Sequence, residues 1–361
     1  MYVGREKLEM HSINEAAEFV NKLDASQRFA AASIRALACA PFHSFGLLYK
    51  KVHRTPFSGK VVAVDGGIAS VDFHGVDVLV WRSCAACFQY DCDKINSAEY
   101  FPSRFPAHEI AAFPSLDGAE YSWHKSLTRL RSEINCANAA LNKFSPSLLL
   151  LDGSILPQTV DKPAKSSSLY AEYEALVTDY LQLYSACAKN QCTLAGVIKD
   201  SRGKKAVELL RNGVSGATAQ ALEKTTDSVL LQYLLEEGER SFSFQYSESE
   251  EHSVLRDFGE RARALHCLYI KPAQWDRPLR VDYLCLAPAG GEEAFADDVA
   301  QKVFALSALN RAYAHPAALI EADLRAAVDP REVEGAVRQL AAKTIGASAF
   351  LALRRDSRPF R

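Results

Sequence analysis

Hydrophobic residues follow two rhythms along the chain: short unbroken runs, and stripes that recur every three or four positions. The runs at 61–64 and 148–151 contain only aliphatic side chains, as expected of strands buried on both faces. Stripes at helical spacing predict helices at about 119–143 and 168–189. Because strands and helices alternate in this way in α/β proteins, the pattern predicts a mixed sheet flanked by helices.

The remaining pattern predicts helical additions at both ends and a further set of core elements. Two helices are expected within 5–40, the second capped by Asp24 or Ser26, and an irregular loop punctuated by prolines is expected at 92–114. The other expected elements are a strand pattern at 68–82, a loop at 156–168, strands from 193, at 264–270 and at 279–286, and helices from 203, at 222–237, at 294–312, at 316–328 and from 332.

Composition and charge restrict the class of protein. The 361 residues are 48% hydrophobic and 24% charged, which suits a globular chain with a sizeable core. The formal net charge of −2 gives no global attraction for nucleic acid, so any polyanion site must be a local basic patch. No run approaches the roughly 20 apolar residues that cross a bilayer, and the first residues lack the apolar segment of a signal peptide.

The cysteines indicate a reducing environment. Nine of them, an odd number, are spread through predicted helices and strands, which favours a cytoplasmic protein over a disulfide scaffold. Cys84, Cys87 and Cys92 form a C-x2-C-x4-C cluster, but no fourth ligand lies at short spacing apart from Asp91 or Asp93. We therefore expect free, partly buried thiols rather than a zinc site.

Both aliphatic runs end in an aspartate followed by glycine, as Asp65-Gly66-Gly67 and Asp152-Gly153. A carboxylate beside a buried strand is costly unless a cation or several donors compensate it. The glycines are expected to let the backbone turn tightly and to leave room for a metal ion or a phosphate. Asp65 and Asp152 are therefore candidate metal ligands.

Two further candidate ligands lie on predicted helices. Glu133 borders the apolar stripe of the 119–143 helix, although periodicity alone favours a surface glutamate beside that stripe. His315 precedes Pro316 at the start of a late helix, where an ordinary cap or surface role is the alternative to a ligand.

Basic side chains follow the strand that begins at residue 193. Lys199 and Arg202 lie at its end, next to Asp200, and ligands of α/β sheets gather beyond such strand ends. We expect these two cations to contact DNA phosphates. Weaker candidates, with a solvated surface role as the alternative, are Lys271, Arg277 and Arg280.

Metal-assisted cleavage of a phosphodiester needs several carboxylates that converge from separate elements. Asp65 on a first strand, Glu133 on the following helix and Asp152 on the next strand meet this demand, in the order found in ribonuclease H-like nucleases. Carboxylate oxygens suit Mg²⁺ or Mn²⁺, and an imidazole from His315 would shift the preference toward Mn²⁺.

Five motifs together resemble the NurA nuclease family. They are VVAVDGGIAS, the helix bearing Glu133, LLLLDGS, AGVIKDSRG and AHPAALIEADL, in the order of the family and over most of residues 55–330. The resemblance implies a ribonuclease H-like core, a Mn²⁺-dependent nuclease acting on DNA ends, a dimer, and a HerA-type hexameric translocase as partner. By motif, the implied catalytic and metal-binding residues are Asp65, Glu133, Asp152 and His315, with Glu109 and Glu120 in the same stretch as Glu133.

The combined prediction is a metal-dependent DNA nuclease, a 5′–3′ exonuclease with single-strand endonuclease activity, that uses Mn²⁺ or Mg²⁺ in DNA end processing. Its expected parts are a helical arm at 1–58, a ribonuclease H-like NurA nuclease domain at 59–330, and a C-terminal helix with a basic tail at 331–361.

Two other functions fit part of the pattern. An actin-like or sugar-kinase-type phosphotransferase shares the core fold and holds phosphate at Asp-Gly turns, but the chain lacks both a G-x-x-x-x-G-K-S/T loop and a late glycine-rich adenosine turn. The other alternative is a non-catalytic adaptor for a DNA motor, in which an unused acidic cluster would repel itself.

Overall fold

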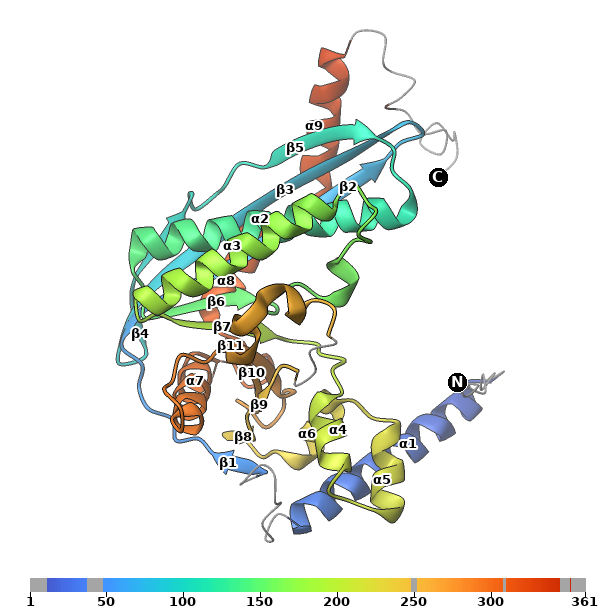
Figure 1. The fold of residues 1–361 in the computed structure, drawn as a ribbon, viewed down its shortest axis with the longest axis vertical. Coiled ribbons are helices and arrows are strands. Elements are labelled where there is room, and N and C mark those ends of the chain that lie inside the picture. The colour runs from blue at the N-terminus through green and yellow to red at the C-terminus, as the bar shows by residue number, and fades with distance from the viewer. Residues whose placement is uncertain (1–11, 38–47, 248–251, 308–309, 345–350, 352–361) are drawn as a thin grey trace.

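One long mixed sheet runs through the protein (Figure 1). The computed structural model describes residues 12–37, 48–247, 252–307, 310–344 and 351. The described strands follow the order β1-β8-β10-β11-β7-β6-β2-β3-β4, with β5 paired to β3 and β9 paired to β10. Their bounds are β1 Tyr49–Lys51, β2 Gly59–Asp72, β3 Val76–Asp91, β4 Lys94–Phe101, β5 Glu109–Pro114, β6 Leu148–Asp152, β7 Thr193–Ile198, β8 Glu239–Ser241, β9 Phe244–Gln245, β10 Leu265–Ile270 and β11 Leu279–Leu284.

Five neighbouring strands form the α/β core. β2, β3 and β4 are antiparallel, whereas β6 lies parallel to β2 and β7 lies parallel to β6. Helix α2 (Gly118–Phe144) precedes β6, and helix α3 (Tyr170–Lys189) precedes β7. Three antiparallel strands followed by two parallel strands, each reached through a helix, make the ribonuclease H-like arrangement, so the predicted fold class is confirmed.

Helices cover both faces of this core. Successive residues of a strand point to opposite faces, so Val62 packs with α2 and α3, whereas Val61 packs with α7 (Glu292–Ser307) and α8 (Ala317–Ala326). Burial on both sides explains why the strand contains an unbroken aliphatic run.

Beyond β7, the sheet continues through β11, β10, β8 and β1, which are antiparallel to one another. Helix α1 (Ile13–Leu37) packs beside this half with three short helices, and α9 (Pro330–Lys343) packs against β3 at the far end of the core. None of the helices in the described ranges combines the length and hydrophobicity that a bilayer span requires. The remaining helices are α4 Lys205–Arg211, α5 Gly216–Glu223, α6 Asp227–Leu234 and the 3₁₀ segments Thr159–Asp161 and Leu255–Ala264.

The main core elements agree with the sequence prediction, but the N-terminal arm differs from it. The described part of 5–40 is one helix rather than two, and both expected caps lie inside it. Asp24 accepts a hydrogen bond from Arg28 one turn later, at 2.7 Å, instead of capping a helix. The arm also contributes strand β1, which pairs with β8.

Two other expected elements are also wrong. The segment 92–114 contains strands β4 and β5, whose side chains are mostly exposed and therefore show no hydrophobic pattern. Of the helix expected at 222–237, only residues 227–234 form a new helix, α6, while 222 and 223 end α5. Helix α6 begins at Asp227, whose side chain accepts the Val207 N–H at 2.9 Å and ties the start of α6 to α4.

Candidate metal centre

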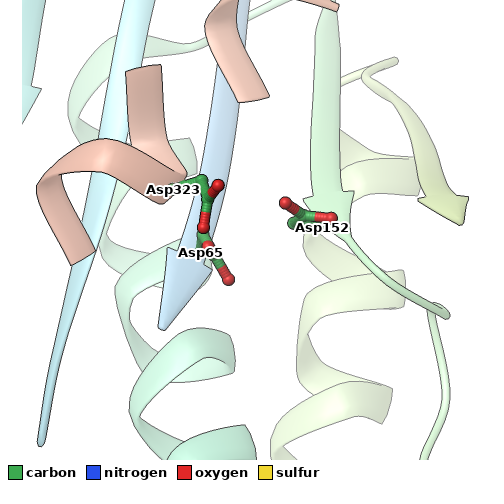
Figure 2. A group of neighbouring side chains, drawn as sticks. All are labelled: Asp65, Asp152 and Asp323. Carbon is green, nitrogen blue, oxygen red and sulfur yellow. The ribbon is translucent and has the colours of Figure 1, made fainter. Parts of the chain in front are cut away.

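Three aspartates from three separate elements converge at one edge of the core sheet. Asp65 lies on β2, Asp152 ends β6 and Asp323 lies on α8, and Figure 2 shows their side chains grouped together. Each contributes a carboxylate oxygen, and these oxygens all lie within 4.8 Å of one another. In the described parts of the chain, this is the group of side chains arranged to hold a metal ion.

Strand register explains why the first two aspartates meet. β2 and β6 are parallel neighbours, and Val64 is paired with Leu151. The next residues, Asp65 and Asp152, therefore lie side by side at the same level of the sheet. The sheet thus converts two Asp-Gly motifs that are far apart in sequence into one acidic site.

The sequence pattern did not single out Asp323, although this residue lies within the AHPAALIEADL motif. It follows Leu319 by four residues, and Leu319 is buried against the sheet. Residues four apart lie on the same face of a helix, so this spacing was a usable signal. The exposed third carboxylate comes from the helix that covers β2.

The environment of Asp65 favours its protonated form in the absence of a cation. Burial raises its pKa to about 7, and repulsion from the Asp152 carboxylate acts in the same direction. The Gly66 N–H donates a hydrogen bond to Asp65 Oδ1 at 2.7 Å and partly opposes this shift. Neutralising this site requires a bound proton or a cation.

Asp152 already has a cation beside it. Lys199 Nζ donates to Asp152 Oδ2 at 2.8 Å and lies 3.9 Å from Asp323 Oδ2. Burial raises the pKa of Asp152, and the hydrogen bond from Lys199 opposes that rise. The end of β7 therefore supplies one positive charge to a site with three acidic groups.

Glu133 lies next to the triad but is not part of it. Its side chain is buried on the inner face of α2 and forms an ion pair with Arg129, one turn earlier. Burial raises the pKa of Glu133 to about 8, against the attraction of Arg129 and with added repulsion from Asp65. The expectation of a surface position, which periodicity alone favoured, is wrong for this residue.

A cavity of about 520 Å³ opens beside Glu133 and Asp152. Three arginines line it: Arg129, Arg202 and Arg280. Arg202 is exposed and forms no ion pair among the described residues. A substrate phosphate that approaches the acidic triad from this side would therefore meet cationic groups.

Arg280, a weaker candidate for DNA contact, donates from Nε to the buried Asp282 at 2.7 Å. Lys271, another such candidate, is itself buried and donates to the Gln232 carbonyl. Arg277 is exposed and lies 3.8 Å from Asp200. Of these three residues, only Arg277 lies on the surface. This is the solvated position that was expected as the alternative to DNA contact.

His315 is separate from the three aspartates. Its side chain is 2% exposed, and neither ring nitrogen has a hydrogen-bond partner among the described residues. Burial and the nearby charge of Lys199 lower its pKa to about 3, which keeps the imidazole neutral. It lines a different cavity together with Lys199, so the geometry does not group it with Asp65, Asp152 and Asp323.

The described cysteines are free. Cys84 and Cys87 are buried within β3, and burial raises the pKa of each thiol to about 11. Cys92 is exposed beyond the end of the same strand. None of these three residues forms a disulfide, and two of them are buried, as the sequence predicts in part.

The fold and the carboxylate cluster define a ribonuclease H-like protein with a candidate divalent-metal centre. The family model of the NurA domain matches residues 59–328, and the chain belongs to this family. The chain is similar in structure to the NurA nuclease from Sulfolobus solfataricus, with a TM-score of 0.57 and 15% identity over 91% of this chain and 93% of that one.

A second similar structure is a NurA crystal structure with manganese. The TM-score is 0.53 and the identity 11%, over 92% of this chain and 99% of that chain. No curated protein sequence matches the chain. The structural similarities support the shared fold, while the family model establishes membership of the family.

Proposed function

We propose that the protein is a metal-dependent nuclease that hydrolyses DNA phosphodiester bonds at Asp65, Asp152 and Asp323. The observation that carries this proposal is the convergence of three carboxylates within 4.8 Å at the edge of a ribonuclease H-like sheet. Such a cluster is costly unless a cation neutralises it, and hard divalent ions prefer oxygen ligands. The donor set therefore fits Mg²⁺ or Mn²⁺.

A divalent ion held there would polarise the phosphate and lower the pKa of an attacking water. The chain's own groups have complementary roles. The three aspartates hold the ion, and Glu133 supplies a further carboxylate beside the site. Arg202 and Lys199 orient the negatively charged strand, in keeping with their predicted contact with DNA.

Manganese is proposed as the working ion, with Mg²⁺ as the alternative. A NurA structure with manganese supports this choice. The expected ligand role of His315 has no support from its position, so we do not include it in the proposed ligand set. Asp323 takes the place of the late ligand.

The finer assignments are part of the same proposal: 5′–3′ exonuclease action with single-strand endonuclease activity, DNA end processing with a HerA-type translocase, a cytoplasmic location and a homodimer. The exposed apolar side chains of α1 support association with a second surface, since they lie uncovered along one helix. If light scattering showed a strict monomer at micromolar concentration, the homodimer would be excluded. The exposed apolar side chains of α1 are Ile13, Phe19, Val20, Phe29 and Leu37.

The decisive experiment uses linear single-stranded and duplex DNA labelled at one end, with Mn²⁺, Mg²⁺ or EDTA. We expect metal-dependent degradation that Asp65→Asn and Asp323→Asn each reduce by more than about a hundredfold, because even residues that only support metal ligands contribute about 10- to 100-fold. Asp91→Asn, at an exposed strand end, is the matched control. Degradation at the parental rate by folded Asp65→Asn would reject the site.

Labels at the 5′ or the 3′ end separate the two polarities, because an exonuclease releases the nearer label first. Circular single strands report the endonuclease activity, since they have no ends. Release of the 3′ label before the 5′ label would reverse the proposed polarity.

A further inference from the structure

A second cavity, of about 420 Å³, borders the metal centre at Lys199. It is distinct from the arginine-lined cavity, and it lies within the size range of pockets that bind small organic groups. Because Lys199 Nζ also contacts Asp152 at 2.8 Å, a group bound in this cavity would be a close neighbour of the acidic triad. The lining residues that matter here are Lys199, Gln232, Trp275, Arg277, Tyr313 and His315.

The inner wall of the cavity contains polar atoms without partners. Both ring nitrogens of His315 and Oε1 of Gln232 are buried and make no hydrogen bond to any described residue. Buried polar groups are nearly always paired in folded proteins, because an unpaired one loses its hydration without replacement. His315 and Gln232 both line this cavity, and their unpaired atoms lie in the protein layer behind its surface.

The outer wall is aromatic. The Trp275 side chain is 75% exposed and Tyr313 is 44% exposed, although large aromatic groups are normally covered. The two loops that carry them are tied together, since Asp276 Oδ2 accepts the Ala314 N–H at 2.6 Å. The loops therefore hold an indole and a phenol ring at the mouth of one polar cavity.

The charges of the lining are balanced. The lining contains two cations, Lys199 and Arg277, and two carboxylates, Asp200 and Asp276, and Arg277 Nη1 lies 3.8 Å from Asp200 Oδ1. This balance disfavours a phosphate as the occupant and favours a neutral, planar group that stacks and forms hydrogen bonds. Unpaired nucleobases have these properties, and aromatic side chains are their usual platforms in single-strand binding sites.

We propose that this cavity binds one unpaired base of the DNA strand whose phosphate is held at the aspartate triad, with Trp275 as the stacking platform. The inference rests on the proposed nuclease function, because DNA is taken as the substrate. Trp275 lies in the KPAQWDRP segment, and this segment would give the protein a preference for single-stranded or frayed DNA ends.

The test measures binding rather than cleavage, by fluorescence anisotropy of a labelled single-stranded oligonucleotide with Ca²⁺, an oxygen-preferring divalent ion, at the triad. Trp275→Ala should weaken binding about tenfold, and Trp275→Phe should restore most of it, since stacking needs a ring. A set of oligonucleotides carries one abasic site at successive positions. At one position the parent should lose affinity, while Trp275→Ala should lose nothing further.

Ile95→Ala, which removes an exposed apolar side chain on β4, should bind all probes like the parent. Equal binding of normal DNA by Trp275→Ala and the parent would overturn the proposal. The proposal would also be overturned if every abasic site weakened binding by the same factor in the parent and in Trp275→Ala. Base-dependent binding by a parent that cleaves nothing with Mn²⁺ or Mg²⁺ would instead reject the nuclease activity and leave the base site standing.

Discussion

Gly66 and Glu133 approach each other so closely that a β-carbon on Gly66 would lie 2.5 Å from Cγ of Glu133. The missing side chain therefore lets the α2 carboxylate reach the residue next to Asp65. Gly67 has the same relationship to α8, since its β-carbon would lie 2.1 Å from the Ala326 carbonyl oxygen. The two glycines thus give space to protein groups, and β2 continues through them without a turn.

This packing predicts that Gly66→Ala and Gly67→Ala lower the DNA cleavage rate. Alanine at 66 displaces Glu133, whereas alanine at 67 pushes the backbone of α8, which carries Asp323. Because overpacking typically costs about 1 to 3 kcal/mol, we expect Gly67→Ala also to lower the free energy of unfolding by that amount. Cleavage assays and urea unfolding measure the two effects.

The control for these substitutions is Gly335→Ala in α9, where an added β-carbon has no heavy atom within 4 Å. It should keep the parental cleavage rate and add roughly 0.5 to 1 kcal/mol of stability, since alanine is favoured over glycine inside a helix. Parental activity of a folded Gly67→Ala protein would show that the position of α8 does not matter for the reaction.

A second prediction concerns stability and pH without metal. The pKa of Asp65 is raised from 3.8 to about 7 and that of Glu133 from 4.5 to about 8. Between about pH 4 and pH 8, the folded protein therefore binds protons that the unfolded chain has released. The contribution of these groups to the free energy of unfolding must then fall as the pH rises through that range.

Asp65→Asn removes one of these groups, so in EDTA it should stabilise the protein more at pH 8 than at pH 5. We expect a difference of about 1 to 3 kcal/mol between the two pH values, because one unit of pKa shift corresponds to about 1.4 kcal/mol. Thermal unfolding of parent and variant at both pH values provides the measurement. An identical stability difference at pH 5 and pH 8 would contradict the raised pKa.

A third prediction separates the two basic candidates for DNA contact. Arg202 forms no ion pair within the described residues, whereas Lys199 is already paired with Asp152. Arg202→Gln should therefore reduce the slope of log affinity against log salt by about one, and Lys199→Gln should reduce it less. Binding titrations in EDTA at several salt concentrations measure both slopes.

The matched control is Lys22→Gln, which removes an exposed lysine on α1 that pairs with Glu18. Its slope should equal that of the parent. If Arg202→Gln also keeps the parental slope, Arg202 does not contact a phosphate.

The sequence predicted the part of the site that strands determine. Unbroken aliphatic runs identified β2 and β6, and the residue at the end of each run supplied Asp65 and Asp152. Asp65 and Asp152 lie together because β2 and β6 are parallel neighbours in register. Two buried strands with the same hydrophobic pattern agree with this pairing but do not establish it. For the same reason, the α/β class was accessible from hydrophobic spacing alone.

The rest of the site depends on packing between distant elements, which spacing alone does not determine. The four-residue spacing from Leu319 puts Asp323 on the same helix face, but its position beside Asp65 follows from how closely α8 lies over Gly67. His315 was the more conspicuous residue in that motif, yet it faces another cavity. Strands β4 and β5 escaped notice because their exposed side chains carry no alternating pattern.

The last prediction concerns which late residue sets the choice of metal. Asp323 has a carboxylate oxygen within 4.8 Å of those of Asp65 and Asp152, whereas His315 is buried beside Lys199 outside this group. Asp323→Asn should therefore weaken activation by both Mn²⁺ and Mg²⁺, since it removes a charged oxygen that either ion accepts. His315→Asn should keep the parental ratio of activities with the two ions, because nitrogen ligation would be its only route to a Mn²⁺ preference. Metal titrations of the cleavage rate at fixed pH decide between them. Loss of the Mn²⁺ advantage in His315→Asn, with unchanged metal activation in Asp323→Asn, would return the histidine to the ligand set and remove the aspartate from it.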